Sequence, residues 1–345
     1  MNTNVFRKIW VSLLGCVSLV GEIGLLANTG EMTVDLVTDI QYKDFVLDED
    51  QKTDVKFCQG NYTFRVLPDE QSVEIVGFLN SASEEEIIIP ATVTHEGVDY
   101  SVVALADKSF SNCNDLKKIQ VPSSVYSFGE WCFSGCTNLE NIQMPTSMKT
   151  IGRSCFWYCT NLKSIQIGEG VEILPDRCFG YCSNLAAIEI PATVTTFEDY
   201  CFSSCSSLEQ IDIPYSVTFI GYHCFSDCSS LKSIEIPSSV TTLRDQCCFI
   251  NCTSLTDVKL PEGITSLGYG FFSGCVNLTT VDIPSSVISL GGNCFADCTK
   301  LSNIEIPSNV KSIGYKCFVN CSALTSISIP DNVTSLGKFC FSHCI

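Results

Sequence analysis

Apolar side chains recur along this chain at a spacing of 23 residues, and phenylalanine marks the repeat most clearly. It stands at positions 110, 133, 156, 179, 202, 225, 249, 272, 295, 318 and 341, with one step of 24 residues between Phe225 and Phe249. Counted from each phenylalanine, the sequence holds ten complete units and an eleventh that stops after five residues. A fixed period of this length indicates a repeat architecture.

Each unit follows the order F-x-x-C-x-x-L-x-x-I-x-I-P-x-x-V-x-x-I-G. The unit that begins at Phe202 continues with Cys205, Leu208, Ile211, Ile213, Pro214, Val217, Ile220 and Gly221. The L-x-x-I-x-I part predicts a strand, whose alternate side chains face opposite sides, and proline ends it because proline cannot donate to the ladder. The V-x-x-I-G part predicts a turn. The i, i+4 spacing of C-F-x-x-C predicts a short helix or helical turn on the convex side.

A unit of 23 residues is too small to enclose a core of its own, so neighbouring units must stack and complete each other's interior. We therefore expect a β-rich α/β solenoid of about ten coils with parallel strands on one face. Its core is expected to hold a single internal row of phenylalanines. These include Phe133, Phe156, Phe179, Phe202, Phe225, Phe295 and Phe318.

This order of Phe, Cys, Leu, Ile, Ile-Pro, Val and Ile-Gly closely resembles the BspA-like leucine-rich repeats of bacterial surface proteins. The resemblance covers residues 87–345, opening with a first coil that starts at Ile87-Ile88-Ile89-Pro90. It implies a secreted or surface-anchored protein that adheres to host matrix proteins or other cells, with no enzyme activity and no cofactor. The sequence departs from the family before the phenylalanine, where the family commonly has alanine and this chain usually has cysteine.

The chain divides into three parts on this interpretation. Residues 1–27 are expected to be a signal peptide, because Arg7 and Lys8 precede an apolar run too short to span a bilayer. Two processing sites stay open: cleavage after Ala27, or a lipoprotein signal that ends before Cys16 and leaves Cys16 lipidated. Residues 28–86 are expected to form a small β cap, and residues 87–345 the solenoid. We expect the sequence to be a fragment, since its last unit is incomplete.

Charge narrows the classes of partner. The net charge is −18, and residues 31–100 carry 16 acidic and 4 basic side chains, a balance of −12. Such a surface repels a phosphate backbone, so nucleic acid is excluded as a partner. Cations, cationic proteins and neutral glycans stay open, and solubility alone would also account for the charge.

The cysteines are the most unusual part of the composition. The chain has 23, and nine C-F-x-x-C pairs hold most of them. Closing a disulfide between positions i and i+4 of one turn would strain its geometry. We therefore favour buried thiols that pack as small apolar side chains. Disulfides between stacked coils and a thiol-based metal or redox sink stay open as alternatives. No catalytic motif is present, and the three histidines lie in separate parts of the chain.

Two sets of exposed residues are candidates for ligand binding. The first is an acidic ladder at the position between the two isoleucines of successive strands, where repulsion would be relieved by a basic partner or Ca²⁺. It comprises Glu189, Asp212, Glu235, Asp282 and Glu305. The second is a set of aromatic residues on loop positions, a residue type common at binding hot spots. It comprises Trp131, Trp157, Tyr158, Tyr181, Tyr200 and Tyr222. A solvated face and packing between ridges of neighbouring coils are the respective structural alternatives.

The sequence as a whole predicts a non-enzymatic adhesion scaffold that acts outside the cytoplasm, either secreted or anchored to the outer membrane. It would bind an extracellular protein or glycan through its repeat surface, without a membrane span in the mature chain. The rival interpretations are a structural spacer for a domain missing from this sequence and the thiol-based sink.

Overall fold

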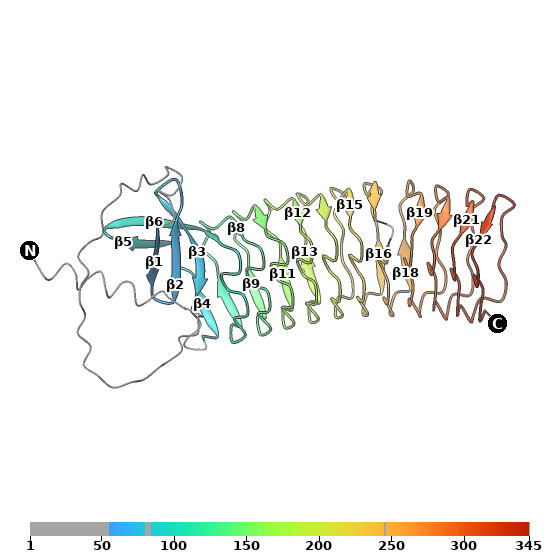
Figure 1. Ribbon diagram of the computed structural model, residues 1–345, viewed down its shortest axis with the longest axis horizontal. Helices are drawn as coiled ribbons and strands as arrows, with labels where there is room; N and C mark the ends of the chain where they lie inside the picture. Colours follow the sequence, from blue (N-terminus) through green and yellow to red (C-terminus); the bar gives the residue numbers. More distant parts are fainter. Residues whose placement is uncertain (1–54, 80–83, 245, 345) are drawn as a thin grey trace, which may run out of the picture.

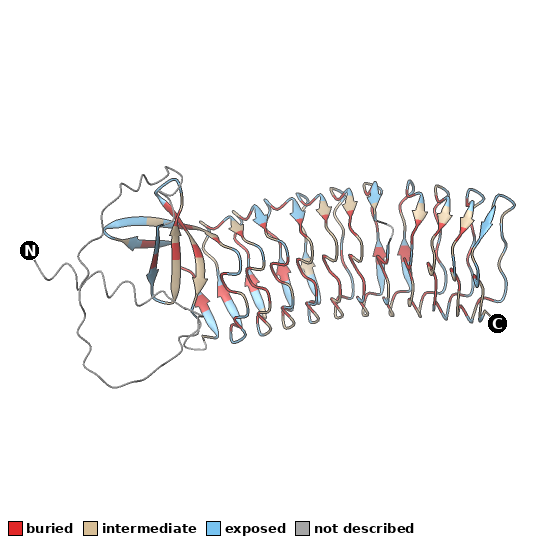
Figure 2. Cartoon of the chain, viewed as in Figure 1, coloured by how far each residue is buried: buried red, intermediate tan, exposed pale blue. Residues whose placement is uncertain are grey.

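The computed structural model describes residues 55–79, 84–244 and 246–344 as an elongated stack of coils that leads away from a small group of strands (Figure 1). The predicted signal peptide, with Cys16, lies outside the described residues, as does the first half of the predicted cap. The solenoid with parallel strands is confirmed. Its buried side chains run along the interior of the whole stack (Figure 2).

The strands before the first coil form an antiparallel meander of β1 (Lys56–Gln59), β2 (Tyr62–Val66) and β3 (Ser72–Phe78). The third strand pairs in parallel with β6 (Val98–Leu105), which also forms a hairpin with β5 (Thr92–His95). The Phe78 ring stacks on Phe110 at 5.2 Å, so these strands cover the apolar end of the phenylalanine row. The boundary at residue 86 stays a prediction.

Each coil contributes to one of two strand rows or to both, which corrects the expectation of strands on a single face. The first row contains β4 (Glu86–Ile88), β7 (Lys118–Gln120), β9 (Asn141–Gln143), β11 (Ser164–Gln166) and β13 (Ala187–Glu189), and then β16 (Ser233–Glu235) and β18 (Asp257–Lys259) as a separate pair. All of these pair in parallel with residues 23 or 24 positions away.

The second strand row falls where the sequence predicts only a turn. It contains β8 (Ser127–Phe128), β10 (Thr150–Ile151), β12 (Ile173–Leu174), β14 (Thr196–Phe197), β15 (Phe219–Ile220), β17 (Thr242–Leu243), β19 (Ser266–Leu267), β20 (Ser289–Leu290), β21 (Ser312–Ile313) and β22 (Ser335–Leu336). Stacking brings the same two residues of adjacent coils into register, as in Phe197 beside Ile220. Two residues then suffice for parallel pairing.

The C-F-x-x-C segment forms no helix in the described residues, so the expected helical component of the fold is wrong. Two residues per coil, two positions before and two positions after the phenylalanine, have positive φ, for example Tyr200 (58°) and Ser204 (62°). Their N–H groups donate to the next coil, to Tyr222 O at 2.8 Å and Ser226 O at 2.7 Å. These bonds along the stack break the run of right-handed residues that a helix requires.

The phenylalanines form the predicted row. From Phe110 to Phe341, successive rings of the eleven repeats lie 5.3–5.7 Å apart and nearly parallel. The rings from Phe110 to Phe318 are completely buried. Aromatic pairs of this kind contribute about 0.5–1.5 kcal/mol each beyond the burial of their area.

The thiols are part of this core. Every cysteine from Cys113 to Cys344 is free, and all but Cys344 are buried, which confirms thiol packing over disulfides in this segment. The second cysteine of each pair also donates to the phenylalanine carbonyl of the preceding coil, as Cys205 Sγ does to Phe179 O at 3.2 Å. A small apolar side chain with a weak donor fits this position, because the bond ties adjacent coils together.

Candidate functional site

The predicted acidic ladder is exposed, but it is not a continuous strand ladder. Glu189 ends β13 and Glu235 ends β16, whereas residues 210–212 between them form no strand, and neither do the segments that carry Asp282 and Glu305. The first strand row persists where Gln120, Gln143 and Gln166 lie side by side and where Glu235 pairs with Lys259. Adjacent like charges destabilise strand pairing, which accounts for the breaks.

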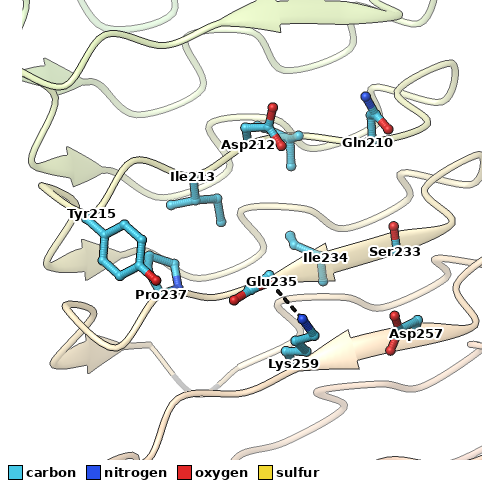
Figure 3. A pocket seen from close by; sticks show the side chains of 11 residues that line it. Gln210, Asp212, Ile213, Tyr215, Ser233, Ile234, Glu235, Pro237, Asp257 and Lys259 are labelled. Carbon is cyan, nitrogen blue, oxygen red and sulfur yellow. Dashed lines mark hydrogen bonds and ion pairs between the residues drawn. The ribbon is translucent and has the colours of Figure 1, made fainter.

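A hollow of about 310 Å³ lies at the first of these breaks (Figure 3). Asp212, Tyr215, Glu235 and Asp257 line it, together with Lys259, whose Nζ lies 3.0 Å from a carboxylate oxygen of Glu235. Within the described parts of the chain, no group of three or more His, Cys, Asp or Glu side chains could hold a metal ion. The acidic positions therefore provide no assembled ligand set for the predicted Ca²⁺, and the thiols provide none for a metal sink.

Four of the predicted aromatic residues form one surface cluster. The Trp131 and Trp157 rings meet edge to face at 5.7 Å, and Trp157 also contacts Tyr158 at 5.2 Å and Tyr181 at 6.0 Å. The two tyrosine rings lie 5.6 Å apart. Tyr158 is 44% exposed and Tyr181 46%, and both tryptophans are half-buried. We call these four residues the aromatic cluster. Packing between ridges explains the contacts, but it leaves much of both tyrosine rings in solvent.

The backbone beneath the cluster is unfavourable for its side chains. Tyr158 and Tyr181 occupy the position two residues after the phenylalanine, with φ of 65° and 62°. All other described units place Asn, Asp, Gly, Ser or His there: Asn112, Gly135, Ser204, Asp227, Asn251, Gly274, Asp297, Asn320 and His343. Bulky residues rarely adopt this left-handed conformation. It costs roughly 1–2 kcal/mol for an ordinary L-residue.

Tyr200 and Tyr222 have different surroundings. The Tyr200 ring stacks on His223 at 4.8 Å, and the Arg177 guanidinium lies 4.8 Å from its centroid. Arg244 lies 4.5 Å from the Tyr222 centroid. These two tyrosines therefore do not join the aromatic cluster, and their ring faces already have partners.

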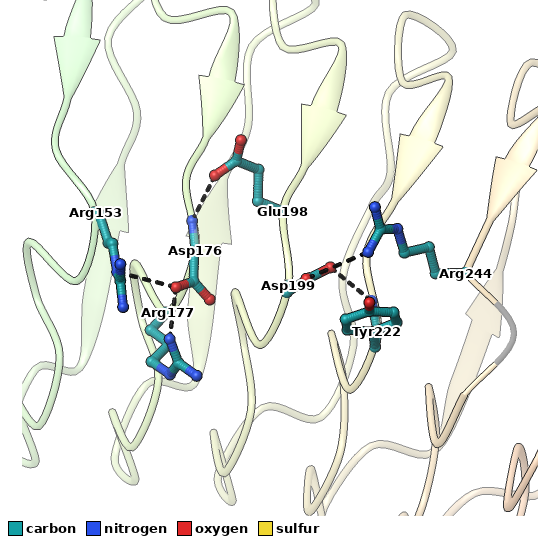
Figure 4. A network of polar contacts seen from close by, with 7 residues as sticks. All are labelled: Arg153, Asp176, Arg177, Glu198, Asp199, Tyr222 and Arg244. Carbon is teal, nitrogen blue, oxygen red and sulfur yellow. Dashed lines mark hydrogen bonds and ion pairs between the residues drawn. The ribbon is translucent and has the colours of Figure 1, made fainter.

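A network of carboxylates and guanidiniums accompanies these stacks (Figure 4). Asp176 accepts from Arg177 at 2.6 Å and pairs with Arg153 at 3.1 Å, while Asp199 pairs with Arg244 at 3.6 Å. Burial raises the pKa of Asp176 in spite of the two guanidiniums. The sequence analysis missed these arginines. Their presence in the same loops as the aromatic residues was the only available signal.

Comparison with known proteins agrees with the geometry. The BspA type leucine rich repeat region matches residues 103–232 and 218–345, in 6 copies, and the chain belongs to this family. No curated protein matches the sequence significantly.

Several solved structures are similar. A leucine-rich repeat protein from Bacteroides ovatus is 26% identical with a TM-score of 0.50, covering 84% of this chain and 92% of its own. The pneumococcal vaccine antigen PcpA is 19% identical with a TM-score of 0.66, covering 85% and 80%, and shares the fold. A leucine rich cell surface protein from Faecalibacterium prausnitzii is 27% identical with a TM-score of 0.47, covering 79% and 94%. In the described ranges, nothing helical has the length and apolar character to cross a bilayer.

Proposed function

We propose that this chain is a non-enzymatic adhesion protein that acts outside the cytoplasm and binds an extracellular protein or glycan through its solenoid surface. Membership of a repeat family used as protein-binding scaffolds supports the general role. The basic and apolar residues at the N-terminus support export, with either release into the medium or a lipid anchor at Cys16.

The aromatic cluster is the observation that carries this proposal. Tyr158 and Tyr181 occupy strained backbone positions, yet their rings are nearly half exposed and so add little to the core. Residues that lower stability without packing gain are typical of functional sites. Aromatic residues provide large contact areas in binding hot spots.

The hollow beside Asp212 and Glu235 is a second candidate surface, for a cationic segment of a protein partner. Asp212, Glu235 and Asp257 outnumber the single cation Lys259 there, and Tyr215 at its edge is 75% exposed. Such a surface would speed association with a basic partner, and added salt would slow it.

Surface plasmon resonance tests the proposal with the purified chain against collagen, fibronectin, laminin and immobilised neutral and sulfated glycans. We expect saturable binding to at least one of them. Either Tyr158→Asn/Tyr181→Asn or Glu189→Gln/Asp212→Asn/Glu235→Gln should weaken it at least about tenfold, which is 1.4 kcal/mol.

Tyr126→Asn is the matched control, because Tyr126 is 42% exposed and makes no ring contact with the aromatic cluster. It should leave the affinity unchanged. Absence of saturable binding to every member of the panel would refute the proposed function.

A further inference from the structure

We infer that the aromatic cluster of Trp131, Trp157, Tyr158 and Tyr181 binds a neutral oligosaccharide. This inference rests on the proposed function and narrows it to one surface and one class of ligand. Three features of the described structure support it: a tryptophan in a column of small residues, uncovered aromatic rings, and a polar but uncharged margin.

Trp157 stands where the other coils use smaller residues. The position directly after the phenylalanine holds Ser111, Ser134, Gly180, Ser203, Ser226, Ile250, Ser273, Ala296, Val319 and Ser342 in the remaining full-length coils and the last partial one. A Cβ atom at Gly180 would lie 3.2 Å from Cδ1 of the Trp157 indole. The glycine in the next coil thus leaves room for the indole. Two adjacent positions of one coil, 157 and 158, therefore carry aromatic rings that the fold itself does not require.

The rings of the cluster are free in a way that the other loop tyrosines are not. Tyr200 is covered by Arg177 and His223, and Tyr222 by Arg244. Within the cluster the contacts are edge-to-face or tilted, which leaves ring faces of Tyr158 and Tyr181 toward solvent. A pyranose ring presents a flat C–H face that stacks on such a ring, while its hydroxyl groups stay hydrated at the rim.

The margin of the cluster is polar and carries no uncompensated cation among the nearby loop arginines. Arg153 and Arg177 both pair with Asp176, and Arg244 pairs with Asp199. The sulfate or carboxylate of an acidic glycan would find its cationic partners already engaged, so charge complementarity favours a neutral ligand.

An amide ladder lies in the same three coils as the cluster. Asn161 Nδ2 donates to Asn138 Oδ1 at 3.1 Å, and Asn184 Nδ2 donates to Asn161 Oδ1 at 3.0 Å. Asn161 and Asn184 follow Tyr158 and Tyr181 by three residues. Uncharged groups that both donate and accept suit the hydroxyl groups of a sugar chain.

The test is titration of the full chain with cellohexaose, maltohexaose and chitohexaose, followed by isothermal calorimetry and tryptophan fluorescence. We expect at least one of these neutral probes to bind and to change the tryptophan emission. The Tyr158→Asn/Tyr181→Asn variant should bind it at least about tenfold more weakly. Its melting temperature should be equal to or above that of the unaltered chain, since asparagine tolerates the left-handed conformation. Tyr126→Asn should bind as the unaltered chain does.

Several outcomes would overturn the inference. Failure of all three neutral probes would do so, as would preferential binding of a heparin hexasaccharide or of decaproline at the same cluster. A marked fall in the melting temperature of the asparagine variant would show that the tyrosines serve the fold. If a matrix protein binds and no oligosaccharide does, the inference fails and the proposed function stands; if nothing binds, both fail.

Discussion

Raising the pH above about 9 is expected to unfold the solenoid cooperatively, because its core is filled with protonated thiols. Burial raises the pKa of Cys182 and Cys228 from the usual 9.0 to about 12. It also raises the pKa of the fully buried thiols Cys178, Cys201 and Cys224 well above 9.0. In the unfolded chain these groups ionise near their ordinary value.

The direction of the effect follows from proton binding. Above pH 9 the folded state keeps thiol protons that the unfolded state has lost, so stability is fully present below pH 9 and declines as the pH rises toward 12. Each such thiol removes about 1.4 kcal/mol per pH unit over this range. Five of them would remove about 7 kcal/mol by pH 10, which is comparable to the whole stability of an ordinary domain.

Circular dichroism and tryptophan fluorescence between pH 7 and pH 11, in the presence of a reducing agent, measure this transition. A Cys201→Ala variant should show a slope of stability against pH that is smaller by one proton. Retention of the folded spectrum at pH 11 would contradict a core lined with thiols.

Replacement of Phe202 by alanine is expected to lower the free energy of unfolding by about 3–5 kcal/mol. The Phe202 ring is completely buried and lies 5.7 Å from Phe179 and 5.6 Å from Phe225, with Phe197 edge-on at 5.5 Å. Its removal leaves a cavity in the middle of the row that the flanking coils cannot close without breaking their own strand register.

Denaturant unfolding at pH 7, followed by tryptophan fluorescence, measures the loss. Tyr215→Ala serves as a control, since Tyr215 is 75% exposed and its loss should change the stability by no more than about 0.5 kcal/mol. A loss below about 1 kcal/mol at Phe202 would show that the row is not the core of the stack.

The period of 23 residues predicts the stacking, the phenylalanine row and the packed thiols, because each follows from burying the same apolar positions in every coil. It does not predict the turn geometry around Phe202. The left-handed residues Tyr200 and Ser204 are imposed by N–H bonds to the next coil, and those bonds exist only once the coils are stacked.

A repeat pattern also treats all coils as equal, so it misses differences between neighbours. The break at residues 210–212 depends on which charges lie side by side across coils. The aromatic residues are recognisable as exposed from their loop positions. Their division into the cluster and the covered Tyr200 and Tyr222 depends on where the flexible side chains of Arg177 and Arg244 come to rest.

Disulfide formation between introduced cysteines tests the central claim of stacked 23-residue coils most directly. Gln166 and Glu189 are register partners on β11 and β13, and neighbouring strands lie about 4.8 Å apart, within reach of a disulfide. Mild oxidation of Gln166→Cys/Glu189→Cys should therefore link the two peptides, as read by mass spectrometry. The pair Gln143→Cys/Glu189→Cys, two coils apart at about 9.6 Å, should stay unlinked. Equal linkage of both pairs, or free thiols at positions 166 and 189, would contradict the stack.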